Sequence, residues 1–405
     1  MSTSGGMGTG ENTVSAAGQV GVGGGPAAGA GSLPVPWIYA HGAPYEAGFR
    51  HGVARAEALH AFLDDGLARL NRLLPEPVSL DALRPRLAAF DAEIRAATPE
   101  LAEELTGLAE GAGIGREEAV LLQVRREILG YSRMPAHGDC TTYARPSASP
   151  SPAAAASVYL GAAPEPEARA AVLAQTVDLN GGLDDQIAVL DVARSGAGGR
   201  RALVLSFGGL LGYLGINSDG LAIGLNLVLG GEWRPGLPPY LAIRHLLDHA
   251  SGVDEAIAML RGLRLASSRA LTFCDVSKAA GVEVVGDEYR VLEMREPVHT
   301  NHFLHPDFEA CDELNVFARN SSLLRLKACE AGLAALPGLS GPSAVSVEDR
   351  FKLLSTPPIC VADTGDIRRE RTVAAVVMLP GRGELHVRPG DPSRSATASF
   401  TLAAS

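Results

Sequence analysis

The sequence lacks any run of about 18 to 20 apolar residues, the length that a membrane-spanning helix needs. It also lacks a secretory signal pattern, because the first acidic residue, Glu11, precedes the first basic residue, Arg50, and no apolar stretch follows. Dense clusters of Lys or Arg are missing, and the formal net charge is −11. These absences argue against a membrane or nucleic acid as a partner, and they predict a cytoplasmic protein.

Cysteine is scarce, with five residues in 405. An odd number without an export signal argues against a disulfide framework and predicts reduced thiols. Four of the five fall in strand or helix patterns, where packing is the ordinary role of a thiol (Cys274, Cys311, Cys329 and Cys360). Hydrophobic residues make up 46% of the chain, so a sizeable core can be buried.

The composition divides the chain into three parts. Residues 1–33 are mostly Gly, Ser, Ala and Thr and predict a disordered tail, because such a segment buries too little apolar surface to offset its ordering entropy. Residues 34–139 predict a helical segment without a strand, and residues 140–405 a catalytic core of mixed structure. The expected helices of the first segment cover 44–74, 81–97, 99–111 and 116–129, with Gly113 as a stop signal.

After Cys140, short apolar runs separated by Gly or Asp predict strands. They cover 171–177, 187–192, 202–207, 221–228, 270–274, 282–285, 289–294, 372–379, the neighbourhood of 385–387, and 398–402. Helical patterns interrupt them at 240–249, 253–263, 323–335 and 346–354, and the Pro/Ala/Ser-rich stretch 145–166 predicts an exposed loop. Runs of strands with grouped helices favour the α+β class.

An unusual cysteine lies at the boundary between the helical segment and the strand-rich core, in the stretch His137-Gly138-Asp139-Cys140-Thr141-Thr142. This stretch resembles the cleavage site of the penicillin acyltransferase family (acyl-CoA:6-aminopenicillanate acyltransferases and their relatives). Four further segments resemble family motifs in the same order: 42–52, Gln175-Thr176-Val177-Asp178, 216–226 and His299-Thr300-Asn301-His302-Phe303. The resemblance covers roughly residues 38 to 400.

The resemblance implies a four-layer αββα sandwich of the N-terminal-nucleophile (Ntn) hydrolase type, preceded by a helical pro-segment. It also implies that the precursor cuts itself between Asp139 and Cys140, which leaves two subunits. Free cysteine has a pKa of about 8.5, so a thiol at neutral pH needs a base to become a good nucleophile. An α-amine at the new terminus, with a pKa of about 7.7 to 8.0, can be that base.

The family motifs imply roles for further residues. Asp178 would orient the α-amine of Cys140, and Asn301 would donate a hydrogen bond to the oxyanion of the tetrahedral intermediate. Asn226 matches a second oxyanion position, and Arg325 matches an arginine that lies near the nucleophile. Each of Asp178, Asn226 and Arg325 also has an ordinary structural interpretation, as a turn, strand-end or exposed helical residue. Thr372 is a weaker match to a family serine linked with maturation.

The neighbouring histidines, His299 and His302, are interpreted as structural supports, because no acidic or cysteine ligand lies at a suitable spacing for a metal. No cofactor is implied. The expected partner is a small-molecule amide or an acyl-CoA-type substrate. Asp139 stands where glycine is frequent in the family, and Thr176-Val177 replaces the usual Asn-Trp pair.

Three hypotheses remain open from the sequence. The first is an amidohydrolase or acyltransferase that forms an acyl-thioester on Cys140, and Gln175 favours the acyltransferase branch. Hydrolysis of small N-acyl or β-alanyl conjugates without transfer is its simpler form. The second is an uncleaved hydrolase with a Cys140–His299 pair, and the third is a non-catalytic binding relative of the same fold.

Overall fold

The computed structural model describes residues 35–130, 140–147, 171–194, 199–336 and 345–402. The predicted tail 1–33, residue Asp139 and most of the predicted loop 145–166 lie outside these ranges. Within them, no helix is both long enough and apolar enough to cross a membrane.

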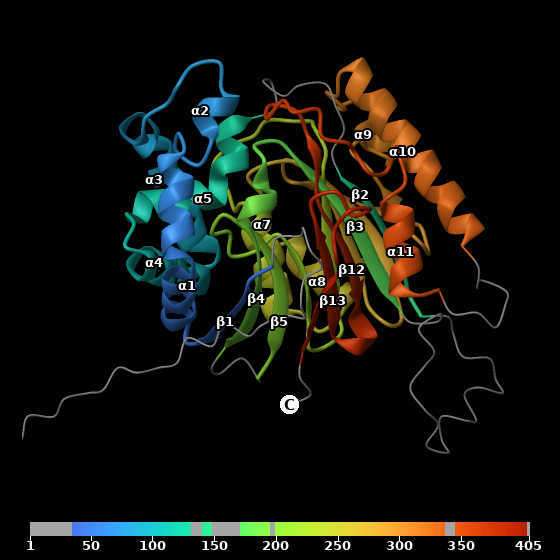
Figure 1. Ribbon diagram of the computed structural model, residues 1–405, viewed down its shortest axis with the longest axis horizontal. Helices are drawn as coiled ribbons and strands as arrows, with labels where there is room; N and C mark the ends of the chain where they lie inside the picture. Colours follow the sequence, from blue (N-terminus) through green and yellow to red (C-terminus); the bar gives the residue numbers. More distant parts are fainter. Residues whose placement is uncertain (1–34, 131–139, 148–170, 195–198, 337–344, 403–405) are drawn as a thin grey trace, which may run out of the picture.

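Two β-sheets pack face to face at the centre of the molecule (Figure 1). The first, sheet A, contains in spatial order β1 (Trp37–Gly42), β4 (Ile187–Arg194), β5 (Arg201–Phe207), β6 (Leu214–Asn217), β7 (Ala222–Leu227), β8 (Arg269–Cys274), β9 (Ala279–Val285) and β10 (Glu288–Leu292). The second, sheet B, contains β11 (Val298–His299), β2 (Thr141–Arg145), β3 (Val172–Leu179), β12 (Arg371–Leu379), β13 (Glu384–Pro389) and β14 (Ala398–Thr401). Neighbouring strands are antiparallel except β1 and β4, which are parallel.

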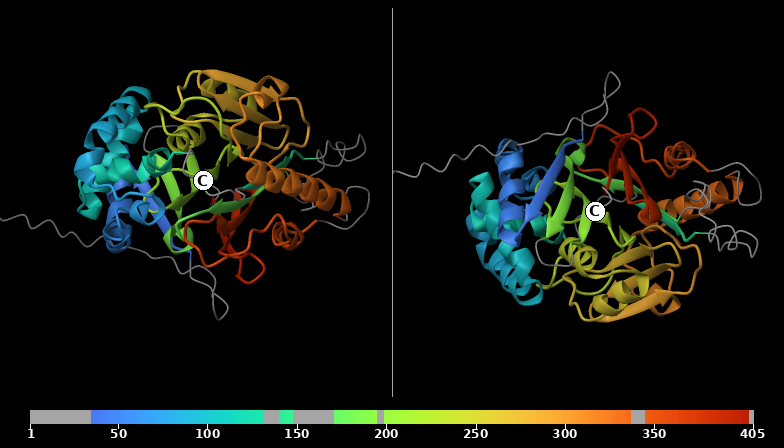
Figure 2. Two further views of the ribbon diagram at one scale, coloured as in Figure 1. Left: turned by 90° about the horizontal axis from the view of Figure 1, so that it is seen from above. Right: turned by 90° about the horizontal axis from the view of Figure 1, so that it is seen from below.

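Helices cover the outer face of each sheet (Figure 2). On the side of sheet A lie α1 (Pro44–Asp64), α2 (Leu70–Leu73), α3 (Leu80–Ala97), α4 (Pro99–Ala112), α5 (Arg116–Leu129), α7 (Pro239–His249) and α8 (Val253–Leu260). On the side of sheet B lie α10 (Val316–Ala335) and α11 (Val347–Leu354), with the short α9 (Pro306–Glu309) nearby. The predicted α+β class and the four-layer αββα order are therefore confirmed.

The first segment is not purely helical, which corrects the prediction that no strand precedes residue 139. Trp37–Gly42 forms β1 at the edge of sheet A, in register with β4 from Trp37 opposite Val189 to Gly42 opposite Arg194. The pairing partner lies about 150 residues away in the sequence, so no local pattern identifies this strand.

The first predicted helix is also shorter than expected. α1 ends at Asp64, and the next residues include three with left-handed backbone, Leu67, Ala68 and Arg69. Arg69 donates hydrogen bonds to the carbonyl oxygens of Gly181 and Gly182, at 2.9 and 2.6 Å. Tertiary contacts of this kind outweigh the helical pattern that the sequence presents.

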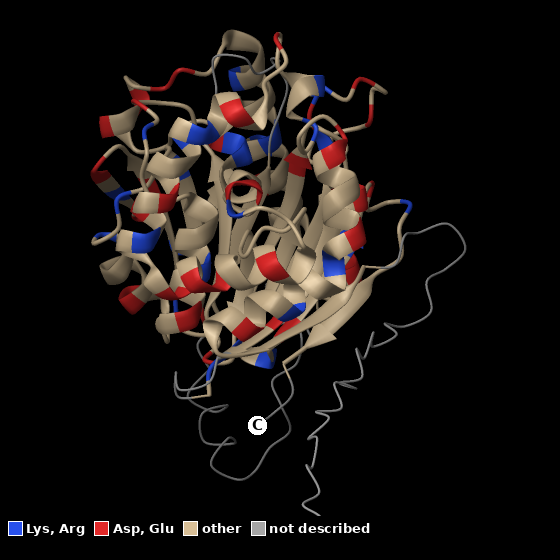
Figure 3. Ribbon diagram, turned by 90° about the vertical axis from the view of Figure 1, so that its left-hand side faces the viewer, with Lys and Arg blue, Asp and Glu red and all other residues tan. Residues whose placement is uncertain are grey.

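The segment Gly48 to Gly52, which resembles a family motif, brings α1 and α4 into close contact. A Cβ on Gly48 would lie 1.8 Å from the carbonyl oxygen of Glu104, and one on Gly107 would lie 2.0 Å from that of Tyr45. Only glycine permits this approach. The outer faces of the same helices carry interspersed acidic and basic residues (Figure 3).

Next to this contact His51 is buried, at 1% exposure, and neither ring nitrogen has a hydrogen-bond partner among the described residues. Burial lowers the pKa of His51 to about 3, and the charges of Arg55 and Arg244 lower it further. Because the unfolded state binds a proton near pH 6.5 and the folded state does not, stability should be complete above pH 6.5 and decline as the pH falls towards 3.

We therefore expect His51 to cost about 2 kcal/mol of folding stability when the pH is lowered from 7.5 to 5. Urea unfolding at both pH values, for the wild type and for His51→Leu, measures this. The variant should lose less stability on acidification than the wild type. An equal loss in both would show that other groups account for the pH dependence.

Candidate active site

Cys140 lies directly before β2, between the neighbouring strands β3 and β11 of sheet B. Thr141 pairs with Thr176 on β3, and Thr142 pairs with His299 on β11. The Cys140 side chain is 3% exposed. The predicted nucleophile is thus fixed at the end of a central strand.

The main-chain carbonyl of Cys140 accepts hydrogen bonds from two predicted site residues. Asn226 Nδ2 lies 2.8 Å from this oxygen, and Arg325 Nη1 lies 2.9 Å from it. Asn226 is on β7 of sheet A and Arg325 is on α10, so residues from three layers meet at Cys140. Both side chains are fully buried, and this precludes the alternative of an exposed helical Arg325.

Arg325 also connects Cys140 to Asn301. Its Nη2 donates to Asn301 Oδ1 at 2.7 Å, while Nη1 donates to Thr141 Oγ1 at 3.1 Å. A planar guanidinium suits this bridging role because its donors lie in a fixed geometry.

The amide nitrogens of the two asparagines are engaged with main-chain oxygens. Asn226 Nδ2 donates to Cys140 and also to the His299 carbonyl at 3.3 Å, so both of its hydrogens have partners. Asn301 Nδ2 donates to the Leu227 carbonyl at 2.9 Å, and its second amide hydrogen has no acceptor among the described residues. The oxyanion role stays a prediction for both, and Asn301 has the more available donor.

α10 holds the loop that contains Asn301. Ser322, one helical turn before Arg325, accepts from the Asn301 main-chain nitrogen at 2.8 Å and contacts His302 Nδ1 at 2.7 Å. Thr300 Oγ1 donates to the Ser322 carbonyl at 3.1 Å. Residues at i and i+3 share a helix face, so one face of α10 positions both the loop and the guanidinium.

The two histidines, His299 and His302, are buried and make hydrogen-bonding contacts with neighbouring residues. His299 Nδ1 contacts the Thr300 carbonyl at 2.8 Å, and Nε2 contacts Glu283 Oε1 at 2.9 Å. Burial lowers the pKa of His302 to about 4, so this imidazole is neutral at pH 7. Both ring nitrogens of His299 thus contact oxygen atoms away from Cys140. These contacts agree with a structural role for the two histidines.

Asp178, at the end of β3, is fully buried. Its Oδ1 accepts from Thr372 Oγ1 at 2.6 Å, and its Oδ2 accepts from Thr176 Oγ1 at 3.4 Å. Thr176 in turn accepts from the main-chain nitrogen of Thr141 at 3.1 Å. Thr176, which departs from the usual family motif, thus connects Asp178 to Thr141, the residue next to Cys140. Thr372 donates a hydrogen bond to the same carboxylate.

A small pocket brings Cys140 and Asp178 together with residues that the sequence did not indicate. Its wall also includes Arg126, Tyr213, Tyr240 and Arg269. Tyr213 Oη lies 3.9 Å from Cys140 Sγ. Burial raises the pKa of Tyr213 well above its usual value of 10, and proximity to Cys140 raises it further, so the hydroxyl keeps its proton.

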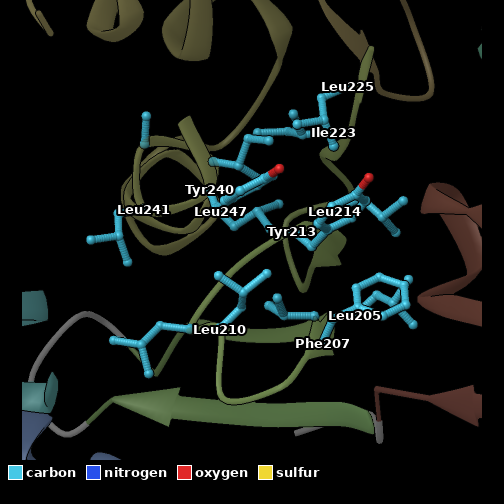
Figure 4. Close-up of a cluster of buried hydrophobic side chains, with 14 of the residues drawn as sticks. Leu205, Phe207, Leu210, Tyr213, Leu214, Ile223, Leu225, Tyr240, Leu241 and Leu247 are labelled. Carbon is cyan, nitrogen blue, oxygen red and sulfur yellow. The ribbon is translucent and has the colours of Figure 1, made fainter. Parts of the chain in front are cut away.

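No motif marks these wall residues, because tertiary packing assembles them. Tyr213 stacks on Tyr240, with ring centroids 5.1 Å apart (Figure 4). Arg269 lies over the Tyr240 ring at 5.8 Å and pairs with Glu127 on α5 at 3.2 Å. The predicted helical segment therefore contributes to the pocket of the predicted nucleophile.

Three of the other cysteines, Cys274, Cys329 and Cys360, are poor candidates for a nucleophile. Burial raises the pKa of Cys329 to about 12 and that of Cys360 to about 11, and it raises that of Cys274 further. Thiols with such pKa values are protonated at neutral pH and react slowly.

The model of the acyl-coenzyme A:6-aminopenicillanic acid acyl-transferase family matches residues 165–357 of this chain. The acyl-coenzyme A:6-aminopenicillanic-acid-acyltransferase 40 kDa form of Emericella nidulans is 24% identical over 288 residues, which cover 69% of this chain and 72% of that protein. The predicted resemblance to the penicillin acyltransferase family is confirmed. The family match contains Asp178, Asn226, Asn301 and Arg325, and it begins after Cys140.

Solved structures with a similar arrangement include the Caenorhabditis elegans ortholog of N-acylethanolamine-hydrolyzing acid amidase, at 15% identity and a TM-score of 0.42, over 65% of this chain and 100% of that one. Penicillin V acylase from Agrobacterium tumefaciens has 15% identity and a TM-score of 0.44, over 65% of this chain and 86% of that one.

Proposed function

We propose that this chain is a self-cleaving cysteine amidohydrolase or acyltransferase of the Ntn type, which acts on amide C–N bonds through an acyl-thioester on Cys140. The family match supports an enzyme of the amidohydrolase and acyltransferase class. The observation that carries the proposal is the convergence on Cys140: Asn226 and Arg325 hold its carbonyl, and Asp178 lines the same pocket as its thiol.

In the proposed maturation, Cys140 Sγ attacks the carbonyl carbon of Asp139. The peptide C–N bond breaks, the sulfur takes the acyl group, and the nitrogen becomes the free α-amine of Cys140. Water then opens the thioester and leaves a carboxylate on Asp139. The bonds from Asn226 and Arg325 fix the Cys140 carbonyl, which keeps the residue in place while its own amide bond is cut.

In the proposed turnover, the α-amine takes the thiol proton and Sγ attacks the substrate carbonyl. Asp178 stabilises the resulting ammonium, and the second amide hydrogen of Asn301 stabilises the oxyanion. The C–N bond breaks, the amine leaves with the proton, and the acyl group remains on sulfur. Water or an acceptor amine then releases it.

The proposed division into subunits 1–139 and 140–405 requires that both pieces stay together after cleavage. β1 of the first piece pairs with β4 of the second. Two buried ion pairs join them as well: Arg244 with Glu104 at 2.9 Å and Arg269 with Glu127 at 3.2 Å. Removing one partner of such a pair leaves a buried charge without its counter-ion, at a cost of about 3 to 5 kcal/mol, so a substitution at either pair should weaken the association of the pieces.

Hydrolysis of a small N-acyl or β-alanyl conjugate and transfer from an acyl-CoA donor share the same thioester. Gln175 uses both ends of its amide on the main chain of Leu225, donating at 2.7 Å and accepting at 3.1 Å. Gln175 therefore connects the two sheets. Although this residue resembles the acyltransferase branch of the family, its amide group is engaged in this connection and does not contact the substrate. Cytoplasmic residence remains a prediction of the sequence.

The uncleaved Cys140–His299 hydrolase is the less favoured candidate, because both ring nitrogens of His299 are engaged elsewhere. A non-catalytic relative would form no covalent intermediate, so the next experiment separates it from the proposal.

Incubation with valeryl p-nitroanilide or valeryl-CoA should add one valeryl group to the fragment 140–405, on Cys140. Rapid acid quench followed by intact-mass and peptide mass spectrometry measures this, and neutral hydroxylamine should remove the group because thioesters react with it. Cys311→Ser, which changes a thiol outside the site, should still be acylated. Turnover without a Cys140 adduct would contradict the proposal. Added amines then distinguish transfer from hydrolysis.

A further inference from the structure

The hydroxyl of Tyr213 lies next to the sulfur of Cys140, and the maturation and turnover proposed above give it no role. Tyr213 is 3% exposed, and its Oη lies 3.9 Å from Cys140 Sγ. This is the only hydrogen-bond contact of the hydroxyl among the described residues. A buried hydroxyl without a close partner lowers stability, whereas phenylalanine would pack the same ring without that cost. The ring accounts for the packing, so the function of the hydroxyl lies at the sulfur.

Packing holds the ring of Tyr213 in place. Tyr213 directly precedes β6, its ring lies edge-on to Phe207 with centroids 5.0 Å apart, and it stacks on Tyr240 at 5.1 Å (Figure 4). The preceding residue, Gly212, packs so closely on α7 that a Cβ there would lie 2.4 Å from the Tyr240 carbonyl oxygen. Gln123 of α5 holds the same loop, because its Oε1 accepts from a main-chain nitrogen at 3.0 Å. Both pieces of the proposed mature enzyme therefore position the hydroxyl.

The hydroxyl acts only as a donor once the sulfur is charged. Burial raises the pKa of Tyr213 well above 10, and the nearby Cys140 raises it further, so the phenol keeps its proton. A thiolate has no proton to give, so the hydrogen bond then runs from Oη to Sγ. Charge-assisted hydrogen bonds are shorter and stronger than neutral ones. The contact should therefore tighten when the thiolate forms.

We propose that Tyr213 donates a hydrogen bond to the thiolate of Cys140, both when the thiol is activated and when the sulfur leaves the thioester. The inference rests on the proposed function of Cys140. In activation, the α-amine takes the thiol proton, and the hydroxyl stabilises the thiolate that remains.

The same charge returns when the acyl group is released. Water attacks the thioester carbonyl and gives its proton to the α-amine, the C–S bond breaks, and its electron pair stays on sulfur. The ammonium then returns the proton to the thiolate. Tyr213 keeps its own proton throughout, so one donor serves the sulfur as nucleophile and as leaving group.

Tyr213→Phe removes the hydroxyl and keeps the ring. We expect the midpoint pH for alkylation of Cys140 by iodoacetamide to rise by about one pH unit, the lower end of the range for a hydrogen bond to a charged group. Below both midpoints the variant should react about tenfold more slowly than the wild type, and above both it should react equally fast, because the thiolate is the nucleophile. Peptide mass spectrometry measures the modified fraction of Cys140 from pH 5 to 10, separately for cleaved and uncut chains.

The other ionisable groups of this pocket stay in place in the variant. They come from four elements: Arg126 of α5, Asp178 of β3, Tyr240 of α7 and Arg269 of β8. The comparison therefore isolates the hydroxyl of Tyr213.

Tyr143→Phe is the matched control, because Tyr143 is also a buried tyrosine and belongs to a separate hydrophobic cluster that includes Phe351 of α11. Its midpoint should equal that of the wild type. An unchanged midpoint in Tyr213→Phe, a rate reduced by the same factor at every pH, or a wild-type Cys140 that resists the reagent throughout would overturn the proposal. A midpoint that shifts in a chain that forms no thioester with valeryl p-nitroanilide would instead overturn the proposed function, since alkylation does not depend on turnover.

Discussion

Replacing Cys140 by alanine should leave one full-length chain of 405 residues, whereas the wild type should yield two fragments that meet between Asp139 and Cys140. Alanine has no nucleophile to attack the preceding carbonyl, so the acyl shift has no first step. Intact-mass spectrometry of both denatured proteins measures this, and the effect is all or none.

A matched control is available in Cys329, a buried thiol whose pKa is raised to about 12. Cys329→Ala should still be cut at Cys140, since a protonated thiol outside the pocket takes no part. A wild-type chain that stays uncut, or a large fragment that begins at another residue, would exclude the maturation step and leave the fold untouched.

The fragments of the wild type should separate only under denaturing conditions. The parallel pairing of β1 with β4 and the buried pair Arg244–Glu104 both cross the cleavage point. Size-exclusion chromatography in native buffer should therefore give one peak that contains both masses. Arg244→Met removes one partner of that pair and should weaken the association.

The bounds of α3, α4 and α5 could be predicted within one residue because the signals at their ends are local. α3 begins after Ser79, whose hydroxyl accepts from the Ala82 nitrogen at 3.2 Å, and α4 ends at Gly113, whose φ is 70°. β1 could not be predicted, since its strand conformation depends on distant β4. The start of α10 at Val316 was missed although Asn315 caps it through two main-chain nitrogens.

The residues of the candidate site also differ in whether the sequence alone could identify them. Cys140, Asp178 and Asn301 lie within short motifs, so their resemblance to a family could be recognised. Tyr213, Tyr240 and Arg269 carry no such motif, and only tertiary packing brings them to the pocket of Cys140. Residues that lie within short motifs can therefore be identified from the sequence, whereas residues that form the wall of a pocket by tertiary packing cannot.

Changing Asp178 to asparagine should lower kcat/KM by about 10² to 10⁴, the range for a group that supports proton transfer in the transition state. The side chain keeps its size but loses the charge that would stabilise the α-ammonium of Cys140. Rates must be divided by the fraction of cleaved chains, measured by intact mass, because maturation uses the same residues.

Asp191→Asn is the matched control, since Asp191 is a fully buried carboxylate in sheet A that pairs with Arg201 at 2.7 Å, away from the pocket. It should lower the stability without changing kcat/KM per cleaved chain. If Asp178→Asn behaved in the same way, Asp178 would be a structural carboxylate and the proposed role would be wrong.

The contact between Thr372 and Asp178 extends this test. The Thr372 hydroxyl donates to Asp178 Oδ1 at 2.6 Å and accepts from the Val361 nitrogen at 2.9 Å, so it fixes the carboxylate relative to β12. Thr372→Val should lower kcat/KM by about tenfold, because it removes a hydrogen bond to a charged group, and Thr372→Ser should restore it. A change in kcat without a change in KM would show that Thr372 acts by positioning Asp178 in the reaction step and not by binding substrate.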